Sequence, residues 1–481
     1  MKETRKSPWM PLLITGGLIL LSRIVPVPDG LSRDSIYLLG ILASTILLWM
    51  TVDVTWPSVF CILSLSLMSH TSLSSMITSS MGNPTITFLI FSFCCSTALE
   101  DTQFVRRCAI SFLSIPFAKG KPWLLVLLYF LSVLLLGSIM STTVIVIIYL
   151  SINEELFAVF GLKKGDKLGK LFTTGLIIVS AFSGAVTPIA HVFPLMAMNL
   201  YTTATGQEIS YVSYILMALP TALMSLAVLM LLFRILLQPD MSRMVNLDLS
   251  LLRQSLMPVD RKEVITVSVF LSVCALWILP DLLTGLLPSV SALLKGFGTP
   301  MPPMLGSILL CILQADGKPV MDLRKTLPRI PWTSIFMAAS ALALGGQLSS
   351  KELGLTAYVS QAMVPLTSSI PPILFLELMV AFTGFLTNIA SNMVVLTLAC
   401  SIVLSASGLL GSSVHMGAMC AIIGMMSAYA FATPPAMTTV VLGTGSGWTT
   451  NGDMAKYGFL TLIAACLFAI FISYPIASFL M

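Results

Sequence analysis

Long apolar stretches, separated by short polar loops, run through almost the whole chain. A helix that crosses about 30 Å of hydrocarbon needs about 20 mainly apolar residues. We therefore predict eleven membrane-spanning helices near 9–27, 35–52, 55–70, 84–102, 168–201, 211–237, 263–280, 289–313, 331–349, 411–446 and 456–480. The pattern predicts an all-α polytopic membrane protein, whose surroundings are a lipid bilayer.

Two further apolar stretches, 122–153 and 370–407, are too long for one crossing, and small polar residues interrupt each of them near its middle. Lipid cannot hydrogen-bond backbone that leaves helical geometry, so such backbone lies against protein or lines a cavity. We expect each stretch to form a re-entrant hairpin that leaves the membrane on the side where it entered.

The positive charges indicate the orientation, because Lys and Arg gather in cytoplasmic loops. With the N-terminus in the cytoplasm, the basic groups named below all fall inside only if both hairpins re-enter, 122–153 from the cytoplasm and 370–407 from outside; Arg33 and Lys351 then lie in outer loops. The C-terminus is then outside, and we expect the plasma membrane. These groups are Lys2, Arg5 and Lys6; Arg106, Arg107, Lys119 and Lys121; Lys163, Lys164, Lys167 and Lys170; Arg243, Arg253, Arg261 and Lys262; and Lys318, Arg324, Lys325 and Arg329.

The composition agrees with a membrane protein. Hydrophobic residues make up 57% of the chain and charged residues 9%, whereas a soluble domain carries about 25% charged residues. The net charge of +5 is small and scattered, so we expect no nucleic-acid partner. The nine cysteines lie in or beside apolar stretches without zinc-type spacing, so neither a transition-metal site nor a cofactor is predicted.

The two halves of the chain resemble each other in inverted topology. Segment 86–104 resembles 332–353, and each half carries a Thr-Pro step in a long apolar stretch after its hairpin. We therefore divide the chain into a first half, 1–237, a cytoplasmic linker, 238–262, and a second half, 263–481. Inverted repeats with broken helices are typical of secondary transporters.

The interrupted segments are the candidate site. We expect the hairpin tips, 137–142 and 387–392, and the helix breaks, 184–194 and 432–436, to converge on one polar chamber. Helix N-termini at the tips suit the carboxylate of an anion. Unwound carbonyls and Ser, Thr and Asn oxygens suit a hard cation such as sodium.

Two motifs in the second half carry a family resemblance: Leu-Thr-Asn-Ile-Ala-Ser-Asn-Met at 386–393 and Ala-Thr-Pro-Pro-Ala at 432–436. Through them the chain resembles the divalent-anion:sodium symporter family, over nearly its whole length. The resemblance implies a sodium site, here termed the second sodium site, formed by Thr387, Ala390, Asn392 and Ala432. It also implies substrate contacts from Ser141, Thr142, Thr143, Ser391, Asn392, Thr433 and Pro434.

The first half departs from the family pattern, with Thr142 where the family has Asn. The resemblance places a first sodium site at Ser138, Ser141, Thr142 and Gly184. His191, just beyond Thr187-Pro188, could supply a positive charge in place of a sodium ion. The alternative interpretation of His191 is a hydrogen-bonded packing residue.

These observations predict a secondary active transporter that moves small divalent anions by alternating access. The expected substrates are C4 and C5 dicarboxylates such as succinate, malate and 2-oxoglutarate, with sodium as the coupling ion. Sodium-independent dicarboxylate exchange and citrate or sulfate transport are the alternatives. The resemblance also implies a homodimer in which a transport domain moves against a scaffold domain. Three scattered histidines and no His-Glu-x-x-His motif argue against an enzyme.

Overall fold

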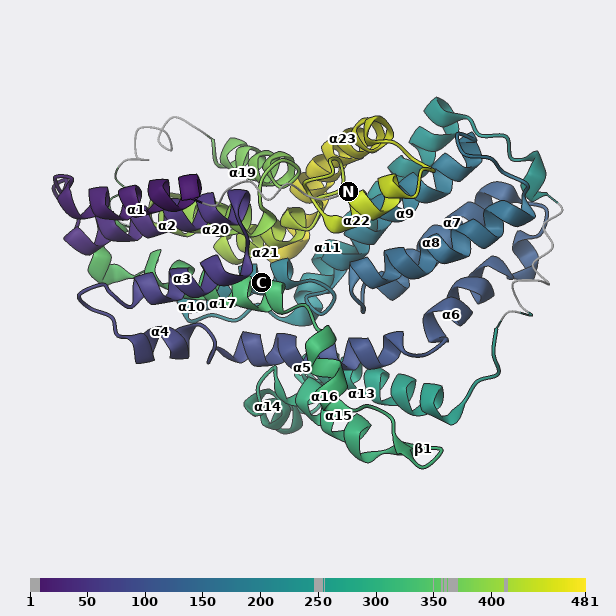
Figure 1. Ribbon diagram of the computed structural model, residues 1–481, viewed down its shortest axis with the longest axis horizontal. Coiled ribbons are helices and arrows are strands. Elements are labelled where there is room, and N and C mark those ends of the chain that lie inside the picture. The colour runs from purple at the N-terminus through teal and green to yellow at the C-terminus, as the bar shows by residue number, and fades with distance from the viewer. Residues whose placement is uncertain are drawn as a thin grey trace.

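The computed structural model describes residues 9–245, 254, 256–348, 350–355, 358, 361, 371–410 and 414–481. In this part of the chain nearly all regular structure is helical (Figure 1). The two strands found there, β1 (Gln314–Ala315) and β2 (Lys318–Pro319), pair antiparallel around a tight turn. The expectation of an all-α protein is confirmed.

The first six helices precede the first hairpin. Ser32 and Ser72 each cap the next helix with a capping box, and Asn83 caps a helix whose first residue is Pro84. The first, second and third helices pack in sequence order. The six are α1 (Trp9–Ile24), α2 (Arg33–Thr51), α3 (Thr55–Leu65), α4 (Leu73–Ser79), α5 (Pro84–Glu100) and α6 (Phe104–Leu113).

Both long apolar stretches form pairs of helices. The first hairpin consists of α7 (Pro122–Gly137) and α8 (Thr142–Val159), and the second of α19 (Pro372–Leu386) and α20 (Asn392–Leu410). The chain leaves helical geometry at 138–141 and again at 387–391. The predicted interruptions are therefore confirmed, whereas re-entry from opposite sides of the membrane stays a prediction.

The helix that follows each hairpin is broken at its Thr-Pro step. After the first hairpin, α9 (Lys167–Val186) is followed by α10 (Val192–Thr205); after the second, α21 (Met416–Ser427) is followed by α22 (Thr438–Gly445). Proline supplies no N–H and clashes with the preceding turn, so Pro188 explains why α9 ends at Val186. In the second half α21 ends earlier, at Ser427, six residues before Thr433. The expected breaks are confirmed, and each half presents a hairpin packed on a broken helix.

Each half then ends in a long helix. These are α11 (Tyr211–Leu232), which continues into a π-helical turn at η2 (Phe233–Leu237), and α23 (Asn451–Phe468), which continues through η7 (Ala469–Ser473) into α24 (Tyr474–Leu480). The two long helices pack against each other. They run for 27 and 30 residues, enough to cross a bilayer with some tilt.

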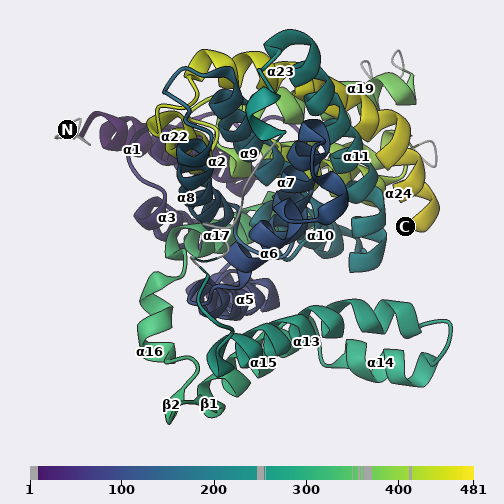
Figure 2. The same ribbon diagram turned by 90° about the vertical axis from the view of Figure 1, so that its right-hand side faces the viewer.

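One predicted span is wrong as a single helix. Stretch 289–313 is divided into α14 (Pro288–Gly296) and α15 (Met301–Ile312), both of which pack on α13 (Arg261–Leu283). Gly298 between them has φ +75°, a left-handed conformation that glycine adopts without strain, and Pro300 follows. Figure 2 shows α13, α14 and α15 together with the strands at one edge of the molecule.

One further long helix is α17 (Trp332–Leu348), and the remaining short elements are η1 (Pro116–Ala118), η3 (Ser242–Met244), α16 (Leu323–Thr326), η4 (Leu327–Arg329) and η5 (Lys351–Leu353). Most of the predicted linker 238–262 lies in the described part, but 246–253 and 255 lie outside it. Among the described residues, six helices are long and apolar enough to span a membrane, or seven if the bent pair α4–α5 counts as one. Eleven crossings therefore stay a prediction.

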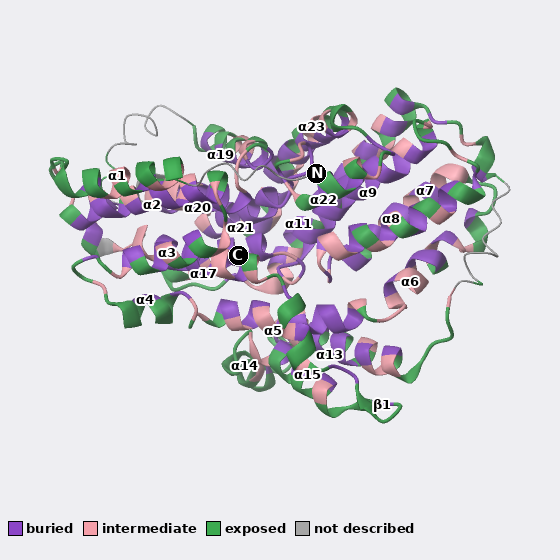
Figure 3. Cartoon of the chain, in the orientation of Figure 1, coloured by how far each residue is buried: buried purple, intermediate pink, exposed green. Residues whose placement is uncertain are grey.

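The buried centre of the molecule lies where the two halves meet. Helices α9 and α21 are almost completely buried, whereas peripheral helices such as α14 expose much of their surface (Figure 3). Across the halves, α10 packs against α20 and α21, and α22 packs against α8 and α9. Each broken helix therefore contacts the hairpin and the broken helix of the other half. These reciprocal contacts hold both breaks in the core.

Candidate functional site: two hairpin tips on two broken helices

In the second half, the hairpin tip is bonded to the helix break through Asn388. Its Nδ2 donates to the carbonyls of Gly384 (2.8 Å) and Tyr429 (2.9 Å). Its Oδ1 accepts from the backbone N–H groups of Phe431 (2.9 Å) and Ala432 (2.7 Å). The side chain is fully buried and uses both donors and both acceptor sites, so it fixes backbone that has left the helix.

Further hydrogen bonds join the same tip and break. Thr387 donates to the carbonyl of Ser427 (2.9 Å), and Thr433 donates to the carbonyl of Asn388. Asn392 Nδ2 donates to the carbonyl of Ala436 (3.2 Å). Four predicted residues of the second half, Thr387, Asn392, Ala432 and Thr433, therefore lie together on one bonded frame.

The Asn392 side chain has one unused atom. Its Oδ1 is buried and accepts no hydrogen bond in the part of the chain that the structure describes. A buried carbonyl oxygen without a donor is costly unless a ligand satisfies it. Hydroxyl and carbonyl oxygens of this kind are what a hard cation requires.

The first half repeats one part of this arrangement. Thr187 donates to the carbonyl of Ser138 at the first tip, as Thr433 does to the carbonyl of Asn388 at the second tip. Ser138 has a hydroxyl where Asn388 has an amide, and that hydroxyl donates within its own helix to Leu135 (2.7 Å). The threonine of each Thr-Pro step thus fastens its hairpin tip, but the network around Asn388 has no counterpart at Ser138.

Gly184, Thr142 and His191 meet in the first half. A Cβ added at Gly184 would lie 2.6 Å from Thr142 Cγ2 and 3.4 Å from His191 Cδ2. The His191 ring stacks at a tilt against Phe193, with centroids 4.3 Å apart. Its Nδ1 is buried and has no hydrogen-bond partner among the described residues. The structure therefore does not show His191 as a hydrogen-bonded packing residue, and its proposed charge stays a prediction.

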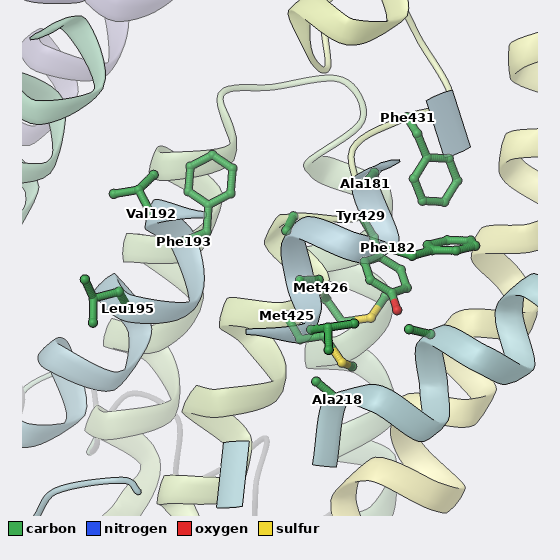
Figure 4. Close-up of a cluster of buried hydrophobic side chains, with 14 of the residues drawn as sticks. Ala181, Phe182, Val192, Phe193, Leu195, Ala218, Met425, Met426, Tyr429 and Phe431 are labelled. Atoms are coloured by element: carbon green, nitrogen blue, oxygen red, sulfur yellow. The ribbon is translucent and has the colours of Figure 1, made fainter. Parts of the chain in front are cut away.

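Large apolar side chains lie beside the two breaks. Phe182 packs against Tyr429 (centroids 5.0 Å apart) and Phe431 (5.4 Å), so α9 and the second break meet through aromatic rings. Figure 4 shows these three rings in one buried cluster with Met425 and Met426. Because Asn388 accepts from the N–H of Phe431, the second tip lies beside this buried apolar cluster.

The remaining predicted residues lie at the tips and breaks as expected. Helices α8 and α20 begin at Thr142 and Asn392, so their first-turn N–H groups face the non-helical tips. Ala432 is fully buried; Ala390, Ser141, Thr143, Ser391 and Pro434 are partly exposed. A single chamber shared by both tips stays a prediction.

Asn388 is the residue that sequence reasoning missed, although it lies inside the quoted tip motif. Its role depends on backbone groups more than 40 residues away. The sequence did offer one signal for this role. Asn388 lies at a predicted interruption of the helix, where backbone N–H and C=O groups lose their helical partners and need others.

Taken together, the predominantly apolar helices and the two helix pairs packed on broken helices define a multi-pass membrane protein. The model of the sodium:sulfate symporter transmembrane region matches residues 6–479. The chain therefore belongs to this family, and the resemblance predicted from the two motifs is confirmed.

Similar proteins carry the name sodium-dependent dicarboxylate transporter SdcS. The protein of Staphylococcus saprophyticus is 23% identical over 489 residues, covering 96% of this chain and 91% of the relative. Those of Staphylococcus aureus strains bovine RF122 and NCTC 8325 are 22% and 23% identical over 496 residues, covering 98% of this chain and 93% of each relative. The family and these names indicate a transporter rather than an enzyme.

Proposed function

We propose that this protein is a sodium-coupled symporter of C4 and C5 dicarboxylates. The observation that carries the proposal is the bonded frame of the second half, where Thr387 and Asn392 both bond to the helix break and Asn392 Oδ1 is buried without a partner among the described residues. The names of the relatives support sodium and a dicarboxylate as the transported species.

In this proposal the second sodium site uses oxygens of Thr387, Ala390, Asn392 and Ala432. Thr387 and Thr433 donate their protons to carbonyls, which leaves lone pairs of their hydroxyl oxygens for other partners. The substrate's carboxylates meet the first-turn N–H groups of α8 and α20 together with the hydroxyls and amides of the predicted substrate residues. Dipoles and the co-ion thus balance the dianion's charge.

Alternating access would then move both tips together. The two hairpins and broken helices would form the transport domain, because they contact one another across the halves. The other helices would form the scaffold, at which two copies pair in the plasma membrane with the N-terminus in the cytoplasm. This division into domains rests on the resemblance and on the packing.

Sodium-independent exchange is the second candidate, and one observation favours it. At the first tip the Thr142 methyl group packs closely on Gly184 and the His191 ring lies next to it, where the resemblance places the first sodium site. A protonated His191 would provide one positive charge there without sodium. Citrate or sulfate is the alternative substrate, and sulfate appears in the family's description.

Uptake into proteoliposomes tests the proposal. Labelled succinate and 2-oxoglutarate are offered with an inward sodium gradient or with choline, and with internal unlabelled dicarboxylate or with empty vesicles. We expect saturable uptake that needs sodium and not internal substrate. Uptake that needs internal substrate and ignores sodium would instead establish exchange. If neither acid enters, the proposed dicarboxylate substrate is wrong and sulfate and citrate are tested; failure of all four contradicts transport of dianions altogether.

A further inference from the structure

A narrow pocket lies at the tip of the first hairpin. It is lined by Ile139, Met140 and Ser141 from the tip and by Ile189 and Ala190 from the break between α9 and α10. The opposite wall comes from α5 and α13, which pack against each other. The pocket therefore lies between the predicted moving part and helices outside it.

Two serines of α5 line this pocket, Ser92 and Ser96. They are four residues apart and so lie on one face of the helix. Their exposed fractions are 7% and 6%, and neither hydroxyl has a hydrogen-bond partner in the described part of the chain. Other lining residues of this wall are Phe93, Cys95, Phe270, Val273 and Trp277.

Several buried serines of this protein bond to their own helix, whereas Ser225 and Ser427 are, like Ser92 and Ser96, buried without a partner among the described residues but do not line this pocket. Ser132, Ser180 and Ser340 each donate to the carbonyl three residues earlier, at 2.7, 2.8 and 2.9 Å. Ser92 and Ser96 could reach comparable carbonyls of α5 but do not. A buried hydroxyl without a partner costs free energy, so two of them facing one pocket point to a ligand that satisfies them.

The wall of the pocket that the first hairpin forms favours an anion. Helix α8 begins at Thr142, and its N-cap residue, Ser141, makes no side-chain capping bond. The first-turn N–H groups and the positive end of an 18-residue helix therefore remain beside the pocket. Hydroxyl donors on one wall and amide donors on the other match the oxygens of a carboxylate.

We propose that Ser92 and Ser96 bind one carboxylate of the transported dianion and so select substrates by length. The inference rests on the proposed dicarboxylate transport and adds helix α5 to the site. The cavity volume is about 10 Å³, room for about one water molecule, so the pocket takes one carboxylate only when its two walls separate, while the other end of the acid remains at the hairpin tips. Diacids of different length then present their far carboxylate at different distances from α5.

The test measures KM for labelled succinate, and inhibition by unlabelled succinate and 2-oxoglutarate, with Ser92→Ala, Ser96→Ala and the double variant. We expect each single change to raise KM about tenfold or more, the loss of one hydrogen bond to a charged group. We also expect a changed ratio of the two inhibition constants. Removing an unpartnered buried hydroxyl should leave the melting temperature in detergent unchanged or higher.

Ser340→Ala is the matched control, because Ser340 is buried on α17, in the segment that resembles the α5 segment, and bonds within its own helix. It should retain the KM and the inhibition ratio of the unchanged protein. If Ser92→Ala and Ser96→Ala do so too, while Asn392→Ala loses uptake, the inference is wrong and the proposed function stands. If the unchanged protein neither takes up nor is thermally stabilised by any dianion, the proposed function fails, and this inference with it.

Discussion

Two asparagines at the second hairpin tip differ in how their side chains are bonded. Asn388 uses every donor and acceptor site, whereas Asn392 keeps Oδ1 without a partner among the described residues. A saturated side chain holds backbone in place, and an unsaturated one is available to a ligand. The first should matter for stability and the second for transport.

Substitutions at the two positions separate these roles. Asn388→Ala leaves two N–H groups and two carbonyls without their partner, and we expect a loss of about 3 kcal/mol or more in the free energy of unfolding, seen as a lower melting temperature in detergent. Asn392→Ala breaks one long bond and removes the free oxygen. It should keep the melting temperature within a few degrees and abolish sodium-dependent uptake. Equal effects of both changes on melting would contradict this assignment.

The sequence motif located this tip correctly but did not separate the two asparagines. Residue type and spacing predicted polar residues at a helix break, which the structure confirms at 387–391. Which amide becomes saturated depends on the path of the chain through 428–437, and no local pattern encodes that path. Ser92 and Ser96 likewise have no distinguishing sequence signal, because their surroundings depend on how distant segments pack around α5.

At the scale of elements, the first hairpin tip depends on close contact between α8 and α9. A Cβ added at Gly184 would lie 2.6 Å from Thr142 Cγ2, below normal van der Waals distance. Gly184→Ala should therefore displace the tip and lower the maximal uptake rate about tenfold or more. Thr142→Ser removes that methyl group but keeps the hydroxyl.

The double variant Gly184→Ala with Thr142→Ser provides the control, since removing the clashing methyl should restore much of the uptake lost in Gly184→Ala alone. Thr142→Ser by itself should retain uptake. A double variant no better than Gly184→Ala would show that the contact between this residue pair does not position the tip.

At the scale of the whole molecule, the sequence predicted the breaks better than the crossings. Thr-Pro steps and small polar residues act locally, so the four interruptions include the expected positions, although the last begins at 428 rather than 432. The single span predicted at 289–313 is wrong because the prediction used only the apolar character of the stretch, although Gly298 and Pro300 are local signals for a turn. Helix packing across the halves brings the breaks into the core and has no local signal.

The two halves are also joined by an ion pair outside the apolar core. Arg107 on α6 donates from Nε to Glu263 Oε1 (2.9 Å) and from Nη2 to Glu263 Oε2 (3.3 Å), at the start of α13. It also donates to the carbonyl of Met257 (3.0 Å). The Glu263 side chain is 7% exposed, so removing its partner would leave a buried charge.

We expect Arg107→Ala to lower the free energy of unfolding by about 2–4 kcal/mol, measured as the shift in thermal or denaturant unfolding in detergent. The unfolding free energy of Arg107→Lys should lie between those of the unchanged protein and Arg107→Ala, because lysine keeps the charge but cannot form the bidentate contact. Adding Glu263→Gln to Arg107→Ala removes the stranded charge and should recover part of the loss. Arg107→Ala with unchanged stability, or no recovery in the double variant, would mean that this pair does not hold the halves together.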